Sequence, residues 1–350
     1  MSNNRVEVLR MINSNYIKYE NLTQITNEGL QNCNASVAYF YIDLNSVLKT
    51  LYPENVMIED YRAITSCLIN MCAHYREYYW TRHKVDTVFF LIYSDNTPYY
   101  NNMMYPGYNV SMAMTIKNNR LKYDMINHNF NLLKLLCPYL PDIFFINRSE
   151  EVGVIIYDLM SKYDLNNEKA HIILTKDVYN YQLVTLKPNT IILRPKKNKG
   201  EDLSYYISIN NVLEYYLSKR NVKKRSDMLS PNLLSLIMAM NNLPERNIDT
   251  MLNITKTINY LEEMISNNLM INGYNTDILY IGNHICKNEI GFSSMILNNR
   301  FKAIDIVSQQ LLYMTTNKSY KEIVNLNDPN TVRQINNEYF VENPLDLNRL

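Results

Sequence analysis

Glycine is scarce in this chain, with 7 among 350 residues. Loops that hold a phosphate against a helix N-terminus need glycine at fixed spacings, and the sequence contains no such loop and no Walker motif. The five cysteines form no C-x-x-C pair, which argues against a zinc cage and a redox dithiol. The five histidines form no i,i+4 pair, and no Ser/His/Asp arrangement is evident. These absences argue against several common classes of phosphate-binding, metal and hydrolytic sites.

Net charge of one sign is also missing, because 35 lysines and arginines are balanced by 34 aspartates and glutamates. Without a global field, a nucleic-acid or membrane partner must be recognised by a local patch. The sequence has no run of about 18 apolar residues, so it predicts no membrane span. The first 16 residues contain no apolar core of a signal peptide. We therefore expect a cytoplasmic protein without a membrane partner, in the host cytoplasm or associated with virions if the source is viral.

Continuous apolar runs in the first two thirds of the chain are typical of strands buried on both faces of a parallel sheet. The segments between them are long enough for right-handed β-α-β connections. A further strand-like segment begins near residue 203 and leads into a helix. The pattern predicts an α/β fold with a mostly parallel five-stranded sheet flanked by helices. The predicted strands are residues 36–42, 85–93, 142–146, 171–174 and 190–193.

A basic run at residues 219–225 marks a change in periodicity, after which the spacing of apolar residues becomes helical. Helices are predicted there over residues 229–240, 248–265 and 301–313. We expect four regions: an N-terminal arm (1–35), an α/β domain (36–225), a helical region (226–270), and a helical extension with a tail (271–350).

Acidic residues follow the predicted strands where the strands end. Ligands of open α/β sheets bind outside the carboxyl ends of the strands, so we expect these carboxylates to meet in one crevice. Two unit charges ~4 Å apart repel by about 4 kcal/mol at an intermediate dielectric constant. A divalent cation with oxygen ligands, Mg²⁺ or Mn²⁺, relieves that repulsion, and two such ions can clamp a phosphodiester during hydrolysis. The candidate acids are Asp43, Asp95, Glu150, Glu151 and Asp177.

Several segments within residues 37–255 resemble motifs of the flap-endonuclease/5′-exonuclease branch of the PIN-like nucleases. The first-strand Asp motif of that family resembles YIDLNSVL, and its second-strand FDG turn resembles LIYSDNTPYY with the acid displaced by one place. Its EADD helix start is similar to SEEVGVIIYDLM, and its SGDKDLLQLV segment is similar to LTKDVYNYQLV. Its helix-hairpin-helix segment resembles LIMAMNNLPERNIDTML in a degenerate form.

The resemblance implies a PIN-like nuclease domain over residues 36–225 and a degenerate helix-hairpin-helix region over residues 226–270. It further implies that Mg²⁺ or Mn²⁺ is the cofactor and that DNA is the substrate. The implied metal ligands are Asp43, Glu150, Glu151 and Asp177, and Asp95 joins them in the implied catalytic set.

The sequence departs from the family motifs mainly at acidic positions. Tyr179 stands where the second Asp of DKD is expected, and Arg148 stands where the leading Glu of EADD is expected. The later acids are replaced by Asn241, Asn242 and Arg246. The hairpin glycines, which let backbone amides approach a phosphate, are also missing. These departures deplete one of the two metal sites and weaken the expected grip on duplex DNA.

Basic residues in three segments are candidates for contacts with a nucleic-acid backbone. The first segment is a predicted helix above the expected site, preceded by tyrosines that could stack on bases. The others are two basic runs, and all three are equally typical of solvated surfaces. The candidates are Lys117, Arg120, Lys122, Lys196, Lys197, Lys223 and Lys224.

Two functions remain open from the sequence. One is an active, metal-dependent 5′-3′ exonuclease or flap endonuclease acting in DNA replication. The other is a nuclease-derived protein with weak or no activity that binds nucleic acid or serves as an assembly subunit of a phage or virus. The missing acids, the 30 tyrosines and the terminal arms, which are suited to a protein partner, favour the second. Strand-end acids are also ordinary turn and cap residues, so the motifs alone do not decide between the two.

Overall fold

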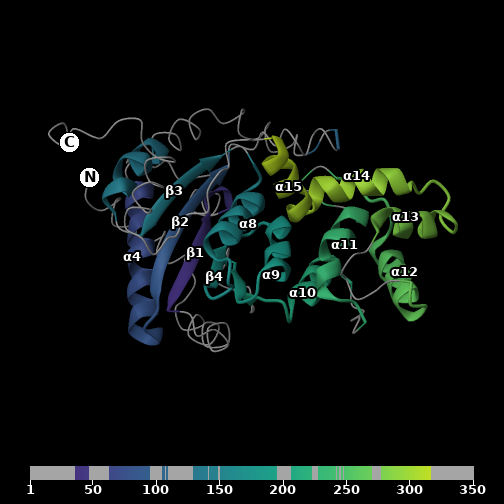
Figure 1. Cartoon of the computed structure of the whole chain (residues 1–350), viewed down its shortest axis with the longest axis horizontal. Helices are drawn as coiled ribbons and strands as arrows, with labels where there is room; N and C mark the ends of the chain where they lie inside the picture. The colour runs from purple at the N-terminus through teal and green to yellow at the C-terminus, as the bar shows by residue number, and fades with distance from the viewer. Residues whose placement is uncertain are drawn as a thin grey trace.

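The structure is a computed structural model, and its elements are labelled in Figure 1. It describes residues 36–46, 63–94, 105–106, 108, 129–140, 142–148, 150–194, 206–222, 228–241, 243, 246, 248–269 and 277–316.

A single sheet forms the centre of the N-terminal part, with the strand order β3-β2-β1-β4-β5-β6. The first five strands are parallel, which confirms the predicted sheet, and the two-residue β6 adds an antiparallel edge. Every residue of β4 and β5 is buried, as the continuous apolar runs predicted. The strands are β1 (Val37–Asp43), β2 (Asp86–Ser94), β3 (Ile143–Arg148), β4 (Ala170–Leu174), β5 (Thr190–Leu193) and β6 (Tyr206–Ile207).

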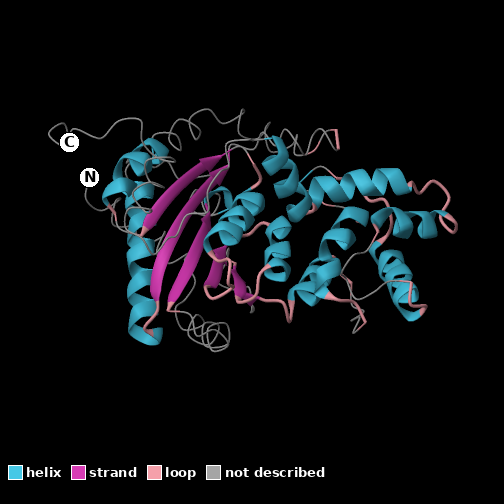
Figure 2. Cartoon of the chain, in the orientation of Figure 1, coloured by secondary structure: helices cyan, strands magenta, loops and turns pink. Residues whose placement is uncertain are grey.

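Helices cover both faces of the sheet, with α4 (Ala63–His83) on one side and α8 (Val152–Tyr163) on the other (Figure 2). The alternation of side chains along β1 explains how both faces are filled. Phe40 packs on Tyr75 of α4, with ring centroids 4.6 Å apart, whereas Tyr41 stacks on Phe90 at 5.2 Å on the opposite face. These layers fix the strand ends, and hence the side chains that follow them.

Short helices connect the later strands and complete the N-terminal part. Residues 129–136 are helical and lead into η1 (Cys137–Tyr139), which precedes β3. The remaining elements here are η2 (Val178–Gln182), α9 (Leu183–Leu186) and α10 (Val212–Lys219).

The C-terminal part is helical, as predicted, and α15 returns to pack against α8 (Figure 1). All seven residues of α11 are buried, so this helix forms the local core. The single helix predicted over residues 301–313 is wrong, because one helix ends at Ile304 and the next begins at Ile306. Asp305 lies between them, and its carboxylate caps α15 by accepting a hydrogen bond from the backbone N–H of Ser308. The helices are η3 (Pro231–Leu233), α11 (Leu234–Met240), α12 (Ile254–Ser266), α13 (Ile278–Cys286), α14 (Ser294–Ile304) and α15 (Ile306–Thr316). Within the described part of the chain, none of the helices is long and apolar enough to cross a membrane.

Candidate functional site

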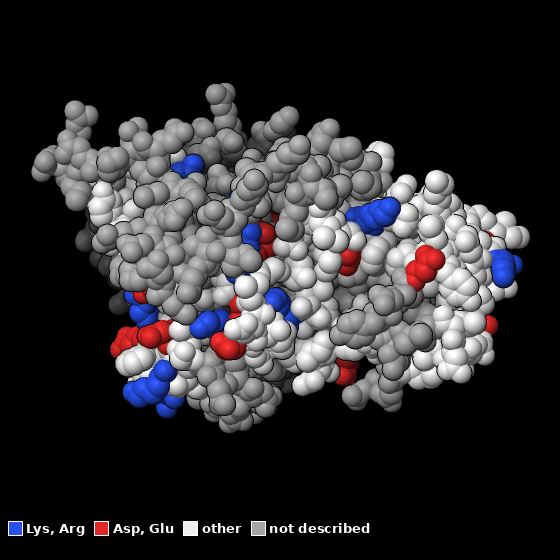
Figure 3. Space-filling model, in the orientation of Figure 1, with Lys and Arg blue, Asp and Glu red and all other residues white. Residues whose placement is uncertain are grey.

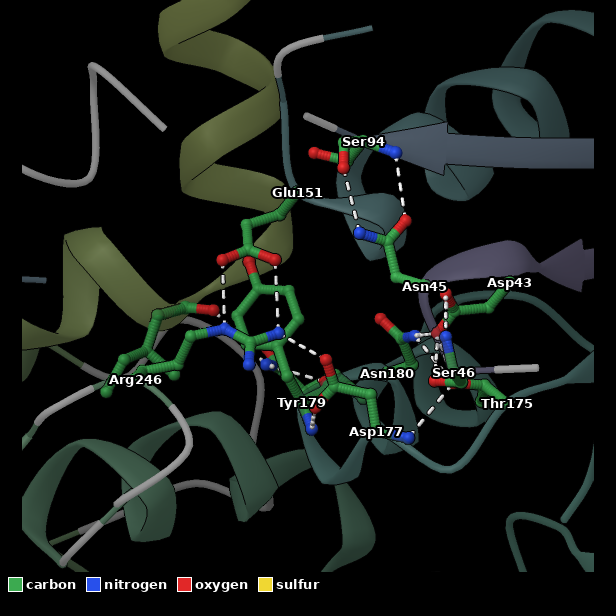
Figure 4. A network of polar contacts seen from close by, with 12 residues as sticks. Asp43, Asn45, Ser46, Ser94, Glu151, Thr175, Asp177, Tyr179, Asn180 and Arg246 are labelled. Atoms are coloured by element: carbon green, nitrogen blue, oxygen red, sulfur yellow. Dashed lines mark hydrogen bonds and ion pairs between the residues drawn. The ribbon is translucent and has the colours of Figure 1, made fainter. Parts of the chain in front are cut away.

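The carboxyl ends of β1 and β4 lie side by side and carry two of the predicted acids to one edge of the sheet (Figure 4). Asp43 is the last residue of β1, and Thr175 directly follows β4. Asp177 is the N-cap of η2, where its carboxylate accepts a hydrogen bond from the backbone N–H of Tyr179 at 3.0 Å. Neighbouring parallel strands thus bring together acids that are far apart in the sequence.

Asp43 is buried and bound by neutral donors. Its carboxylate accepts hydrogen bonds from the Ser46 hydroxyl at 2.6 Å, the Thr175 hydroxyl at 2.6 Å and the Asn180 amide at 3.2 Å. Burial raises the pKa of Asp43, and the nearby charge of Asp177 raises it further, while the hydrogen bonds from Ser46 and Thr175 act in the opposite direction. The carboxylate therefore has most of its acceptor capacity taken up by protein groups.

Glu151 is the N-cap of α8, but its side chain does not cap the helix. It instead accepts two hydrogen bonds from the guanidinium of Arg246, from Nε at 2.9 Å and from Nη2 at 3.1 Å. Nη2 of Arg246 also donates to Asp177 Oδ2. The Arg246–Glu151 pair is thus bidentate, because the planar guanidinium donates one hydrogen bond to each carboxylate oxygen. Bidentate, charge-assisted pairs of this kind are among the strong hydrogen-bonded pairs in proteins.

Arg246 is 2% exposed and lies over the ring of Tyr179, with Cζ 5.1 Å from the ring centroid. Burial lowers the pKa of Arg246, but Asp177 and Glu151 outweigh this effect and raise it overall. For Glu151, burial raises the pKa of the carboxyl group, and the positive charge of Arg246 opposes that shift. The buried cation and its two carboxylates therefore stabilise one another's charges.

A short hairpin brings Arg246 to the carboxylates. Leu243 and Ile248 form an antiparallel bridge, and the backbone N–H of Arg246 donates to the carbonyl of Leu243 at 2.9 Å. The base of the hairpin is held by Arg300 of α14, which donates to the carbonyls of Ala239 at 2.8 Å and Asn241 at 2.9 Å, and also to that of Asp249. The hairpin that carries Arg246 is therefore attached to the C-terminal helices.

No protein-family model matches this sequence, and a search of curated proteins by sequence finds no match. Solved structures do match the fold. The chain is similar to the bacteriophage T5 D15 flap endonuclease, in a pseudo-enzyme–product complex with DNA and metal ions, with a TM-score of 0.53 and 12% identity over 86% of this chain and 97% of that one. It is also similar to the T5 D15 protein co-crystallised with metal ions, with a TM-score of 0.55 and 11% identity over 86% of this chain and 98% of that one. The chain has the PIN-like 5′-nuclease fold.

The 5′-nuclease fold explains why the strand-end acids meet, yet the residues present here do not suit a divalent ion. Arg246 occupies the space between Glu151 and Asp177, and a guanidinium and a metal cannot use the same carboxylate oxygens together. Across the residues that the structure describes, no three His, Cys, Asp or Glu side chains are grouped as a metal site requires. With Arg246 in place, the site does not fit Mg²⁺ or Mn²⁺.

The remaining predicted site residues lie elsewhere or outside the described residues. The Glu150 side chain does not join that of Glu151 and forms an ion pair with Arg148 at 3.8 Å instead. Arg148 also binds Asp158 of α8 at 3.1 Å. Asp95 lies outside the described residues, as do all seven basic candidates for nucleic-acid contact: Lys117, Arg120, Lys122, Lys196, Lys197, Lys223 and Lys224. Their roles therefore stay predictions, as do the metal-ligand roles of the other acids.

Ser94 is the last residue of β2 and directly precedes Asp95, the acid that is displaced by one place from the family motif. It is fully buried, and its backbone N–H and carbonyl are both bonded to the Asn45 side chain, at 2.9 and 2.8 Å. The Asn45 amide thus pairs with the strand end much as another strand would. This position in the 5′-nuclease fold therefore has a short neutral side chain where the resemblance implies an acid.

In the sequence, Arg246 stands out only as a replacement for an acid, and its partners are not identifiable there. The side chains that donate to Asp43 are also not marked as site residues by the sequence, namely Ser46, Thr175 and Asn180. A signal was present for Arg246, because a basic residue that replaces one acid of a carboxylate cluster can pair with the acids that remain. The hydroxyls and the amide carried no such signal, since Ser, Thr and Asn are common at strand ends and turns.

Proposed function

We propose that this protein is a nucleic-acid-binding member of the 5′-nuclease fold in which an internal ion pair has replaced metal-dependent hydrolysis. The observation that supports the proposal is the buried Arg246 guanidinium, which binds both oxygens of Glu151 and one of Asp177. Hydrolysis by two metal ions needs carboxylate oxygens that are free to coordinate cations. Removing one partner of a buried ion pair costs about 3–5 kcal/mol, so a metal ion would have to offset a similar cost to displace Arg246.

The nucleic-acid part of the proposal rests on the fold, since the matched T5 flap endonuclease is a complex with DNA. Figure 3 shows basic and acidic side chains interspersed on the face that it displays. Recognition would therefore be local, and the predicted contacts in the segments around Lys117, Lys196 and Lys223 are the first to test.

The experiment measures binding and cleavage separately. Fluorescence anisotropy with a labelled 5′-flap DNA and a matched duplex gives affinity at several salt concentrations, because phosphate contacts make binding depend on salt. The same DNAs are then incubated with the protein in Mg²⁺ or Mn²⁺ and analysed for products. We expect salt-dependent binding without cleavage. Absence of binding at low salt, or cleavage by the wild-type protein, would contradict the proposal.

An active 5′-nuclease is the second candidate, and one observation favours it. Asp43 and Asp177 do meet at a single edge of the sheet, as a metal-dependent site requires. The double variant Asp43→Ala/Asp177→Ala distinguishes the two candidates. Cleavage by the wild-type protein that disappears in this variant would establish the nuclease, whereas cleavage that persists would come from a contaminant.

A protein partner is a further part of the proposal. The near-neutral charge and the 30 tyrosines suit an assembly subunit of a phage or virus. The terminal arms that would bind the partner lie mainly outside the described residues. Light scattering of the full chain, alone and after deletion of residues 1–35, tests whether the N-terminal arm mediates self-association.

A further inference from the structure

We propose that the Arg246 guanidinium acts as a tethered cation, and that its removal leaves a binding site for a small free cation between Glu151 and Asp177. The inference deepens the proposed function and rests on the same site. It goes further in one respect, because the pocket would recognise a cation that engages oxygens of both carboxylates at once, whether a planar guanidinium or a metal ion.

The backbone segments that carry the two carboxylates are positioned independently of Arg246. The backbone carbonyl of Glu151 accepts the first hydrogen bonds of α8, from the N–H groups of Val154 at 2.9 Å and Ile155 at 3.1 Å. Asp177 is fixed as the N-cap of η2 by the backbone N–H of Tyr179. Truncation of Arg246 therefore leaves both acids anchored on their own elements, with an unbalanced negative charge between them.

The tether comes from a different part of the fold. Arg246 projects from the hairpin closed by Leu243 and Ile248, and the base of this hairpin is held by Arg300 and by α11. Neither Glu151 nor Asp177 takes part in those contacts. The guanidinium can thus be removed without removing the elements that form the walls of its site, which is the condition for a free cation to replace it.

An unused oxygen faces the same region. Asn180 is fully buried, and its amide nitrogen donates to Asp43 and Thr175, whereas its Oδ1 has no hydrogen-bond partner among the described residues. Figure 4 shows the Asn180 side chain between the Asp43 contacts and the Arg246 pair. Its Oδ1 lies only 2.6 Å from where a Cβ on Gly153 would stand, at the start of α8. A buried carbonyl oxygen without a donor is costly unless a cation or another donor can approach it.

One wall of the site is partly exposed. The side chain of Asp177 is 18% exposed, whereas those of Glu151 and Arg246 are 3% exposed each. A cation small enough to fit the vacated space can therefore enter past Asp177. Methylguanidinium reproduces the planar fork of arginine, and Mn²⁺ supplies two positive charges with a preference for oxygen ligands.

The test compares the wild-type chain, Arg246→Ala and the charge-neutral triple variant Arg246→Ala/Glu151→Gln/Asp177→Asn. The melting temperature of each is measured with methylguanidinium chloride, with methylammonium chloride as the control, and with MnCl₂. Binding of Mn²⁺ is followed separately by the loss of its free-ion EPR signal. We expect Arg246→Ala to melt below the wild-type protein and to regain stability with methylguanidinium or Mn²⁺. We expect neither the wild-type chain nor the triple variant to respond.

A response of Arg246→Ala to neither cation would overturn the inference, and so would an equal response of the triple variant. If Arg246→Ala does not fold alone, the readout is the fraction of soluble, folded protein recovered when it is refolded with methylguanidinium or with methylammonium. Equal recovery in both would also overturn it. None of these readouts involves DNA, so the inference can fail while the proposed function stands, and DNA cleavage by the wild-type chain can refute the function while a cation response stands.

Discussion

The hydroxyl of Thr175 donates a hydrogen bond to the carboxylate of Asp43 at 2.6 Å, joining the end of β4 to the end of β1. Both residues are buried, and the same hydroxyl receives a hydrogen bond from the Asn180 amide at 3.0 Å. The Thr175 hydroxyl also lies 3.2 Å from that of Ser46, a second donor to Asp43. The edge of the sheet where the resemblance implies a metal ion is thus held by a network of neutral donors around one acid.

Replacing Thr175 with valine should destabilise the protein by about 1–3 kcal/mol. Valine keeps the shape but removes a donor, which leaves part of the buried Asp43 carboxylate unsatisfied. Urea unfolding followed by circular dichroism measures the change. Thr255→Val on the exposed face of α12 is the matched control, and we expect a change of less than about 0.5 kcal/mol there. Equal effects of the two substitutions would contradict the prediction.

Gly153→Ala should also destabilise the protein, although alanine favours a helix over glycine by about 1 kcal/mol. An added Cβ would lie 2.6 Å from Asn180 Oδ1 and 3.0 Å from Ile306 Cδ1. Overpacking of this kind costs about 1–3 kcal/mol and would push Asn180 away from Asp43. The urea midpoint measures the loss. In the Asn180→Ala background, the same glycine substitution should cost less, and an unchanged cost would show that the contact with Asn180 is not the cause.

The buried pair of His171 and Asp164 should make stability depend on pH. His171 Nε2 lies 3.0 Å from Asp164 Oδ2, and its Nδ1 lies 3.1 Å from the hydroxyl of Tyr41, an arrangement that a neutral ring protonated on Nε2 satisfies. Burial lowers the pKa of His171 below its usual 6.5, and Lys187 acts in the same direction, although Asp164 opposes the shift. The folded protein therefore holds a neutral histidine that takes up a proton on unfolding in mild acid.

Because the unfolded state binds more protons, this contribution is complete above pH 6.5 and is lost as the pH falls below it, by at most about 1.4 kcal/mol per pH unit. The measurement is the free energy of unfolding of the wild-type chain minus that of His171→Gln, at pH 7.5 and at pH 5.5. This difference should be smaller at pH 5.5. The shifted acids Asp43 and Glu151 are common to both proteins and cancel. A difference that is constant or larger in acid would contradict the prediction, and His74→Gln, on the exposed face of α4, is the control.

The sheet could be predicted from the sequence because its determinants are local. Continuous apolar runs such as those at Phe40 and Phe89 need burial on both faces, and the parallel arrangement follows from the length of the connecting segments. The meeting of Asp43 with Asp177 followed from the same reasoning, since neighbouring parallel strands bring their carboxyl ends to one edge. Fold and strand-end positions are thus readable from periodicity.

The chemistry of the site was not readable in this way. Arg246 lies 95 residues from Glu151, on a hairpin without apolar periodicity, and nothing local marks its partner. Glu150 and Glu151 are adjacent and were predicted to act together, but their side chains pair with different arginines, Arg148 and Arg246. Which of two neighbouring acids faces the site depends on where the helix starts, and α8 starts at Val152 with Glu151 as its N-cap.

Arg300 should stabilise the ion pair indirectly, by holding the hairpin that carries Arg246. Its guanidinium donates to the carbonyls of Ala239, Asn241 and Asp249, and it is 2% exposed. Arg300→Met removes these donors and leaves buried carbonyls unsatisfied, which should cost about 2–5 kcal/mol. Lys302→Met, on the exposed face of the same helix, is the control for the loss of a positive charge and should change little.

The coupling between the two arginines is measured by a double-mutant cycle with Arg246→Met. If Arg300 positions Arg246, the Arg246 substitution should cost less in the Arg300→Met background, because the guanidinium is already displaced from Glu151 there. A coupling free energy above about 0.5 kcal/mol is the expected result, since substitutions at independent sites add within that limit. Additive effects would show that the hairpin reaches its place without Arg300, and that the carboxylates alone hold the guanidinium.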